Sequence, residues 1–203
     1  MVLYLSIIFM TMVITSILNI CLGAETFAYY ELWVIASVTL SVIAEFGICG
    51  LFAFIFERVP DKKYNLNAKF YNVSKKERAF YEKIGIKTWK DKVWELGALG
   101  GFRKNKIKDP NSSEYLHKFM IESCKGMWGH IINLVSAYLV LLILPMKYWL
   151  RIGLPVAFVG MFLNLLPTLI LRYNLPKLDV AYRRAKRLEE RAKESSENKE
   201  ESK

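Results

Sequence analysis

Residues 32–56 read LWVIASVTLSVIAEFGICGLFAFIF, an apolar run whose one charged side chain is Glu45. A helix needs roughly 20 residues to cross the hydrocarbon of a bilayer, so this run is long enough to span it. Three further runs are similar in length and hydrophobicity, at Val2–Leu22, Met127–Pro145 and Ile152–Leu171. The sequence therefore predicts an all-α integral membrane protein with four transmembrane helices. With 53% hydrophobic residues gathered into four blocks, an ordinary soluble domain is excluded.

The basic residues predict how these spans are oriented. Glu57–Lys125 contains 17 Lys and Arg and Tyr173–Lys203 contains 9, whereas the connection after the first span contains none. Cytoplasmic loops carry an excess of basic residues, so both long segments are predicted to be cytoplasmic, although Lys147 and Arg151 lie in the other short connection. The first run has no basic residue before it and no small-residue cleavage site after it, which favours a retained helix over a signal peptide. We expect a multi-pass protein of the cell membrane with both termini cytoplasmic.

The net charge and the cysteine content limit the binding partners and metal sites that the sequence predicts. The net charge of +10 is compatible with nucleic acid, but the basic residues flank membrane spans, where anionic lipid headgroups are the nearer partner. We therefore predict binding to anionic lipid and not to nucleic acid, and a homo-oligomer is compatible with the sequence. The three cysteines, Cys21, Cys49 and Cys124, indicate neither a disulfide framework nor a metal site. No bound cofactor or metal ion is predicted.

The segment 57–126 is too long for a simple connection and too aromatic for a disordered linker. Ser74 followed by Glu77 is typical of a capping box, and Phe80 and Tyr81 would give the helix that follows an apolar side. This helix either lies among the headgroups or packs on its own domain. The charged tail at 179–203 is predicted to be helical at first and then disordered.

Trp89, Lys90, Asp91, Lys92 and Val93 lead through Trp94 and Glu95 into a glycine-rich turn, Gly97 to Gly101. No GK followed by Ser or Thr occurs there, so a nucleoside triphosphate site is not indicated. Cations beside tryptophans can hold the phosphates of an activated donor at the membrane surface, organised by Asp91 or Glu95. The alternative is an interfacial anchor formed by Trp94 and Lys92.

Polar residues within the spans also require an explanation, because hydrocarbon offers them no water. With a rise of roughly 1.5 Å per residue, Glu45 lies about 16 Å from the cytoplasmic end of its span, Asn164 about 12 Å and Asn133 about 9 Å. The three could share one polar layer between helices. We interpret Glu45 as a structural residue, a neutral carboxyl bonded to an amide.

His130, one of two histidines, lies nearer the cytoplasmic headgroups, where a water-soluble donor and a lipid acceptor can both arrive. A histidine can remove the proton from an attacking hydroxyl, and a carboxylate can orient its ring. Glu122 is the candidate orienting group, although eight residues of helix separate the two by about 12 Å unless Gly126 or Gly129 permits a bend. His117, five residues before Glu122, is a weaker candidate for acyl-transfer chemistry.

The end of the fourth span is more specific, and here the chain resembles a known family over roughly Phe80–Leu178. The residues that carry the resemblance are Asn164, Pro167, Arg172, Tyr173, Asn174, Pro176, Lys177 and Leu178, together with Trp89 to Lys92 and the run Ile121 to Ser123 that leads to His130. They are similar to the glycosyl-4,4'-diaponeurosporenoate acyltransferases of the staphyloxanthin pathway. Two features depart from that family, namely Met127 in place of a frequent second acid and a proline shifted by one place after Asn164.

The resemblance implies a small membrane enzyme that transfers a fatty acyl chain from a thioester donor, such as acyl-CoA, to a sugar hydroxyl of a membrane glycolipid. It marks as site residues Trp89, Lys90, Glu122, His130, Asn164, Arg172, Tyr173 and Asn174. His130 is expected to act as the base, with Glu122 as its partner. Arg172 is expected to hold a phosphate or polarise the carbonyl, and Tyr173 or Asn174 to donate to the oxyanion.

Two other functions stay open at the level of sequence. The basic segment and the charged tail could belong to a non-enzymatic membrane scaffold that docks a lipid-modifying enzyme. A lipid-active transferase that uses a different donor is a further alternative, although no nucleotide or metal signature supports it.

Overall fold

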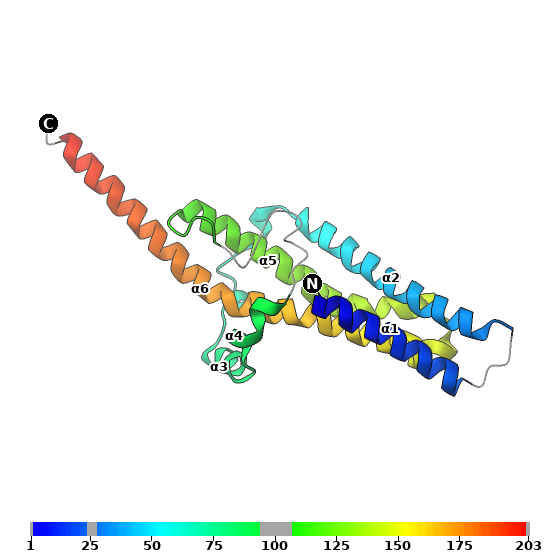
Figure 1. The fold of residues 1–203 in the computed structure, drawn as a ribbon. Helices are drawn as coiled ribbons and strands as arrows, with labels where there is room; N and C mark the ends of the chain where they lie inside the picture. Colours follow the sequence, from blue (N-terminus) through cyan, green and yellow to red (C-terminus); the bar gives the residue numbers. More distant parts are fainter. Residues whose placement is uncertain (1, 24–27, 94–106, 202–203) are drawn as a thin grey trace. The chain divides into compact units, whose positions relative to one another are not determined.

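The computed structural model describes residues 2–23, 28–93 and 107–201, which form helices and turns and contain no strand. Four helices in this part of the chain are long and apolar enough to cross a membrane (Figure 1). They are α1 (Val2–Leu22), α2 (Tyr30–Glu57), α5 (Ser113–Ser136) and α6 (Leu154–Glu201). The predicted all-α membrane fold is confirmed.

Shorter helices connect these four. After α2 come 3-10 turns at Asp61–Lys63 and Lys69–Tyr71, helix α3 (Lys75–Lys83), helix α4 (Ile86–Trp89) and a 3-10 turn at Lys90–Lys92. Between α5 and α6 the chain passes through 3-10 segments at Ala137–Ile143 and Met146–Tyr148 and a π-helical turn at Trp149–Gly153.

Two helices extend further than the sequence patterns indicated. Helix α5 begins at Ser113, well before the predicted start of the third span, because polar residues continue the helical pattern ahead of the apolar run. Helix α6 continues to Glu201, which is further along the charged tail than the part for which the sequence predicted helix. Oppositely charged residues four positions apart, as in Asp179 and Arg183 at 3.0 Å, favour helix in the charged part of α6.

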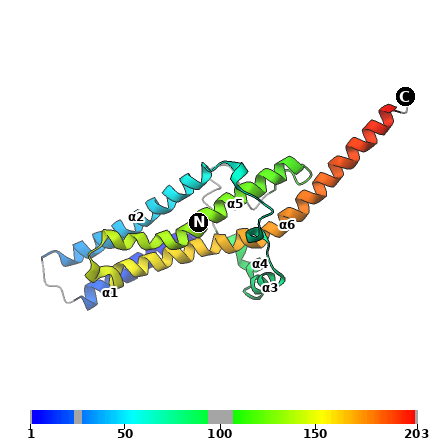
Figure 2. The same ribbon diagram turned by 180° about the vertical axis from the view of Figure 1, so that it is seen from behind.

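The chain divides into two compact units. We call Met1–Val59, Lys92–Trp94 and Gly126–Thr168 the membrane unit, and Pro60–Asp91, Glu95–Lys125 and Leu169–Lys203 the basic unit. In the membrane unit, α1, α2 and the adjoining parts of α5 and α6 run side by side in both views (Figures 1 and 2).

One face of α2 forms the core of the membrane unit. Tyr30, Val34 and Val38 recur every fourth residue and are buried with Tyr148 and Ile152. One turn further along α2, Val42 is buried with Val140 of the 3-10 segment Ala137–Ile143 and with Val156 and Ala157 of α6. Many apolar residues on the other faces of α1 and α2 are exposed, as expected for helices that meet lipid.

Asn19 joins the ends of the helices in the membrane unit. Its Nδ2 donates to the carbonyls of Thr15 (2.8 Å) and Arg151 (3.0 Å), and its own carbonyl accepts from the Tyr30 hydroxyl (3.1 Å). The bonds with Arg151 and Tyr30 join α1 to the turn before α6 and to the start of α2, and hydrocarbon makes such partners within the protein necessary.

In the basic unit, α3 begins as its sequence predicted. Ser74 is the N-cap residue, and its Oγ accepts from the Glu77 backbone N–H at 3.1 Å. Tyr81 on α3 is buried, whereas Phe80 is 53% exposed. The sequence left two alternatives for this helix, which could lie among the headgroups or pack on its own domain. The side of α3 that carries Tyr81 packs on its own unit. A second cluster of this unit joins Phe119 and Met120 of α5 to residues of the second half of α6, Leu178 and Tyr182.

Close packing between α2 and α6 gives the first testable prediction. A Cβ at Gly160 would overlap the Glu45 carboxyl group, whereas a Cβ at Gly47 would meet no atom within 4 Å. Gly160→Val should therefore destabilise the protein by about 1–3 kcal/mol through overpacking, and Gly47→Val should not. Thermal unfolding in detergent measures the difference. Replacing Glu45 with Ala in the Gly160→Val protein should recover part of the loss, and equal melting of the two valine variants would contradict this packing.

Candidate functional site

His130 on α5 and Asn164 on α6 meet within the membrane unit. The His130 Nδ1 lies 3.1 Å from the Asn164 Oδ1, and both side chains are partly buried. The two residues are 34 positions apart, so the contact depends on packing of α5 against α6. The structure thus brings together two of the residues that the sequence analysis selected.

Further hydrogen bonds fix the orientation of the Asn164 amide. Its Nδ2 donates to the Gly160 carbonyl at 3.0 Å and to the Cys49 Sγ of α2 at 3.6 Å. An amide nitrogen has two N–H groups and the amide oxygen accepts, so this assignment turns Oδ1 toward His130. The Nδ1 of a neutral His130 must then carry the proton to make its bond, and Nε2 carries the lone pair.

The other polar residues of the spans gather around the same part of α2. The Asn133 Nδ2 donates to the Cys49 carbonyl at 3.4 Å, and its Oδ1 accepts from Ser136 at 3.3 Å. Asn133 and Asn164 thus contact the same residue of α2, as the predicted polar layer requires. Glu45 is 9% exposed and packs on Gly160, and among the described residues no amide hydrogen bond reaches its carboxyl group. Gly160 and Cys49 accept from the Asn164 amide nitrogen, and the predicted bond from Glu45 to an amide stays a prediction.

Arg172 of α6 forms hydrogen bonds with two other segments of the basic unit. Its Nε and Nη2 donate to the two oxygens of Glu77 on α3, the latter over 3.2 Å, and its Nη1 donates to the Phe70 carbonyl. The guanidinium carbon also lies 5.0 Å from the centre of the Phe70 ring. Three of the five guanidinium N–H groups therefore have protein acceptors. In the structure Arg172 is a bidentate ion-pair partner, and its predicted role toward a phosphate or carbonyl stays a prediction.

The environment of Glu77 changes its acidity. Burial favours the neutral acid, but hydrogen bonds from Arg172 and the Tyr81 hydroxyl outweigh it and lower the pKa of Glu77 below its ordinary value. Burial and the neighbouring Glu77 carboxylate raise the pKa of Tyr81 in turn. Both residues thus keep fixed protonation states at neutral pH, with Glu77 ionised and Tyr81 a phenol.

Tyr173 is buried next to this ion pair. Its ring makes an edge contact with Tyr81, with 6.0 Å between centroids, and the Lys177 Nζ lies 4.0 Å from its ring centre. The Tyr173 hydroxyl is buried without a hydrogen-bond partner among the residues that the structure describes. A buried polar group of this kind is costly, so it is a strong candidate for a functional donor.

The remaining predicted site residues have separate surroundings in the basic unit. Glu122 bonds Lys125 at 3.0 Å, and Lys125 also pairs with Asp61 at 2.6 Å. The Trp89 Nε1 donates to the Ile84 carbonyl at 3.1 Å, and the Lys90 Nζ lies 3.4 Å from Asp91. The role of Glu122 as partner of His130 stays a prediction, as do substrate roles for Trp89, Lys90 and Tyr173.

Three other predictions remain open. Asn174 is partly buried on α6, and its substrate role is untested. The ring of His117 lies near Tyr182, with 5.7 Å between centroids. Trp94, Glu95 and the turn Gly97 to Gly101 lie outside the described residues.

The sequence analysis missed two partners of the site residues. The sequence pattern predicted only a capping-box role for Glu77, although an acid on the side of α3 that carries Tyr81 is a signal for a partly buried ion pair. Cys49 was assigned no role. Its position four residues after Glu45, on the same face of α2, was the available signal that it joins the polar layer.

Comparison with known proteins identifies a family. A sequence model of the glycosyl-4,4'-diaponeurosporenoate acyltransferases matches residues 62–184, which include α3, α4, the whole of α5 and the first part of α6. No curated protein and no solved structure matches significantly. The match is wider than the predicted range Phe80–Leu178 and contains every predicted site residue.

The lowered pKa of Glu77 predicts a pH dependence of stability. The ion pair with Arg172 should contribute its full stability above about pH 4.5, the ordinary value, and lose it as pH falls through the lower folded-state pKa. Glu77→Gln should therefore be less stable than the wild type at pH 7. The difference in stability should shrink as the pH falls below the folded-state pKa of Glu77. Glu82→Gln is the matched control on α3, because Glu82 makes only exposed ion pairs. A gap between wild type and Glu77→Gln that is independent of pH would contradict the ion pair.

The buried Tyr173 hydroxyl predicts a variant that is more stable than the wild type. Tyr173→Phe removes a buried unpaired hydroxyl and should raise the free energy of unfolding by about 1 kcal/mol. Tyr81→Phe is the comparison, because it removes a hydroxyl that bonds Glu77 and should destabilise the protein. Chemical denaturation in mild detergent measures both. A destabilised Tyr173→Phe protein would show that the hydroxyl has a partner.

Proposed function

Because the chain belongs to the glycosyl-4,4'-diaponeurosporenoate acyltransferase family, we propose that it transfers a fatty acyl chain from a thioester donor to a hydroxyl of a membrane glycolipid. The observation that carries the proposal is the contact between His130 and Asn164, both inside the matched region. Acyl transfer to a hydroxyl requires a base, and this histidine is held by an amide whose own orientation is fixed.

The geometry supports a specific protonation state for the base. With Nδ1–H donating to Asn164, the Nε2 lone pair of His130 can accept the proton of the acceptor hydroxyl. The hydroxyl oxygen then forms a bond to the thioester carbonyl carbon, and the electron pair of the C=O bond moves to oxygen. As the carbonyl re-forms, the C–S bond breaks, and the departing sulfur takes the proton from the imidazolium. The products are an ester and a thiol.

The substrates follow from the same chemistry. A carbon–sulfur bond breaks readily because thiols are much stronger acids than alcohols, so a thioester donor such as acyl-CoA requires no metal or cofactor. The acceptor of the family is a glycosylated carotenoid acid, and a sugar hydroxyl on such a lipid could approach a base placed at the edge of the apolar core.

The proposed topology agrees with this chemistry. Four helices can span the bilayer, and the two segments rich in Lys and Arg favour a multi-pass protein of the cell membrane with both termini in the cytoplasm. This orientation would place the basic segments on the side where activated acyl donors are made. Basic residues next to the spans would also attract anionic headgroups.

Removing the base tests the proposal. His130→Ala should reduce acyl transfer by at least about 100-fold, because general base catalysis typically contributes that much, while the protein stays folded and membrane-inserted. His117→Ala, which removes the other histidine, should leave turnover unchanged. The measurement follows a labelled acyl chain from a thioester into the glycolipid fraction of reconstituted membranes. Unchanged turnover in His130→Ala would contradict its role.

The positioning role of Asn164 requires its own variant. Asn164→Ala should lower kcat more than it raises KM, because it releases the tautomer of His130 without removing a substrate contact. If no acyl transfer were found with several donors and acceptors, the non-enzymatic scaffold would become the better interpretation.

A further inference from the structure

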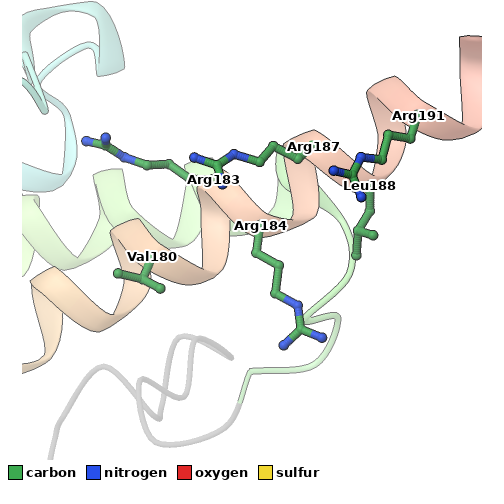
Figure 3. A pocket seen from close by; sticks show the side chains of 6 residues that line it. All are labelled: Val180, Arg183, Arg184, Arg187, Leu188 and Arg191. Carbon is green, nitrogen blue, oxygen red and sulfur yellow. The ribbon is translucent and has the colours of Figure 1, made fainter.

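The second half of α6 presents four arginines on one side. Val180, Arg183, Arg184, Arg187, Leu188 and Arg191 line a shallow hollow of about 430 Å³, and we call them the arginine face (Figure 3). At about 100° per residue, these six positions fall within an arc of about 140° on the helix. All of them belong to the basic unit.

The opposite side of this helix is already occupied. Leu178 and Tyr182 pack with Phe119 and Met120 of α5, and Ala185 is buried. Glu189 accepts from the Ser113 backbone N–H at 2.7 Å and from its hydroxyl. Helix α6 is therefore fixed on α5 by one side, and the arginine face points away from that contact.

The arginine face has an excess of positive charge. Arg183 pairs with Asp179 at 3.0 Å, but Arg184, Arg187 and Arg191 have no ion-pair partner among the residues that the structure describes. Glu189 on the buried side is held by Ser113, whereas Glu194, three residues after Arg191, falls on the same side of the helix as the arginines and leaves them in excess. Val180 and Leu188 are 67% and 47% exposed within the same face, so the surface combines positive charge with apolar contacts. Arginine with exposed apolar side chains is typical of protein interfaces.

The position of the face along α6 argues against a lipid partner. Arg183 follows Leu171, the predicted inner end of the fourth span, by 12 residues, which correspond to about 18 Å of helix. The headgroup layer on one side of a bilayer is only about 5–8 Å thick. For a helix tilted by about 20° from the bilayer normal, the arginines would lie in water beyond the headgroups.

The shape of the face argues against a small molecule. Sites for small ligands typically enclose 70–90% of the ligand surface, whereas every residue of this hollow comes from a single helix. An open, elongated and positively charged helix side fits an acidic protein surface better. A fatty acyl chain also requires a carrier in water, because its apolar surface is too large to stay exposed.

We propose that the arginine face docks a small acidic carrier protein that bears the acyl chain as a thioester. This inference rests on the proposed function, because it names the form in which the donor arrives. The carrier would supply the carboxylates that Arg184, Arg187 and Arg191 lack among the described residues, and its apolar side chains would cover Val180 and Leu188.

A matched pair of double variants tests the proposal in the full-length protein. Arg187→Gln with Arg191→Gln removes two charges from the arginine face, and Lys186→Gln with Lys193→Gln removes two exposed charges elsewhere on the same helix. We expect the arginine variant to bind a purified fatty acyl carrier protein about tenfold more weakly, the combined effect of two exposed ion pairs. The lysine variant should bind like the wild type. Fluorescence anisotropy of the labelled carrier over nanodisc-reconstituted protein measures the affinity, which should fall as salt rises.

A second measurement separates this proposal from the proposed function. With the carrier thioester as donor, the arginine variant should show a KM raised about tenfold, whereas turnover of a short N-acetylcysteamine thioester should be unchanged. Absence of transfer from every donor would overturn the proposed function alone, and carrier binding would still test the docking surface.

Three results would overturn the docking proposal. Equal carrier binding by both double variants would show that the arginines are only solvated. Carrier binding by neither wild type nor variants, with a raised KM for acyl-CoA in the arginine variant, would assign the face to the phosphates of a small donor. A selective loss of binding to vesicles of phosphatidylcholine with one-third phosphatidylglycerol would assign it to lipid.

Discussion

A polar group inside a membrane must find its hydrogen-bond partners within the protein, and the Asn164 amide meets this requirement for three helices together. Its nitrogen donates to Gly160 one turn earlier on α6 and to Cys49 on α2, and its oxygen meets His130 on α5. Each of these bonds limits the others, because one amide cannot rotate to improve one contact without losing another. The position of the His130 ring in the membrane unit thus depends on how all three helices pack.

The basic unit depends on a contact of a different kind. Arg172 follows the apolar part of α6 directly, and its bidentate pair with Glu77 holds α3 against that helix. The same carboxylate accepts from Tyr81, whose ring meets Tyr173. A charge pair suits this position because both side chains remain partly exposed, so neither bears the full cost of burial that a pair within the hydrocarbon would bear.

Sequence patterns predicted the parts of this protein that depend on local properties. Apolar runs of sufficient length predicted four spanning helices, and Ser74 with Glu77 predicted the start of α3, because length, hydrophobicity and capping each act within a few residues. The extent of α6 was missed since its charged tail resembles a disordered segment in composition, although its charge spacing favours helix. The family was recognised from residues near the end of the fourth span, and the match over 62–184 confirms it.

Long-range pairings were much harder to predict. Asn164 was selected as a site residue, but its contact with His130 depends on how two helices rotate against each other, and no local pattern records that rotation. Glu122 was selected as the partner of His130 because it is an acid near a histidine in sequence, and with eight residues of α5 between them this pairing stays a prediction. The acid that Arg172 meets, Glu77, is 95 positions away, so only the folded chain shows the pair.

An amide beside the proposed base, His130, suits a reaction at the edge of an apolar medium. A carboxylate would stabilise the imidazolium more strongly, but an ionised acid next to hydrocarbon costs several kcal/mol unless it is paired, whereas a hydrogen-bonded amide stays neutral. The weaker stabilisation matters little for a thioester donor. Its leaving group is the conjugate base of a thiol with an ordinary pKa near 8.5, so the carbon–sulfur bond breaks without strong acid catalysis and the proton on His130 has a ready acceptor. The neutral pair of His130 and Asn164 therefore fits transfer from a thioester better than transfer from an oxygen ester or an amide, whose leaving groups would require a more strongly supported imidazolium.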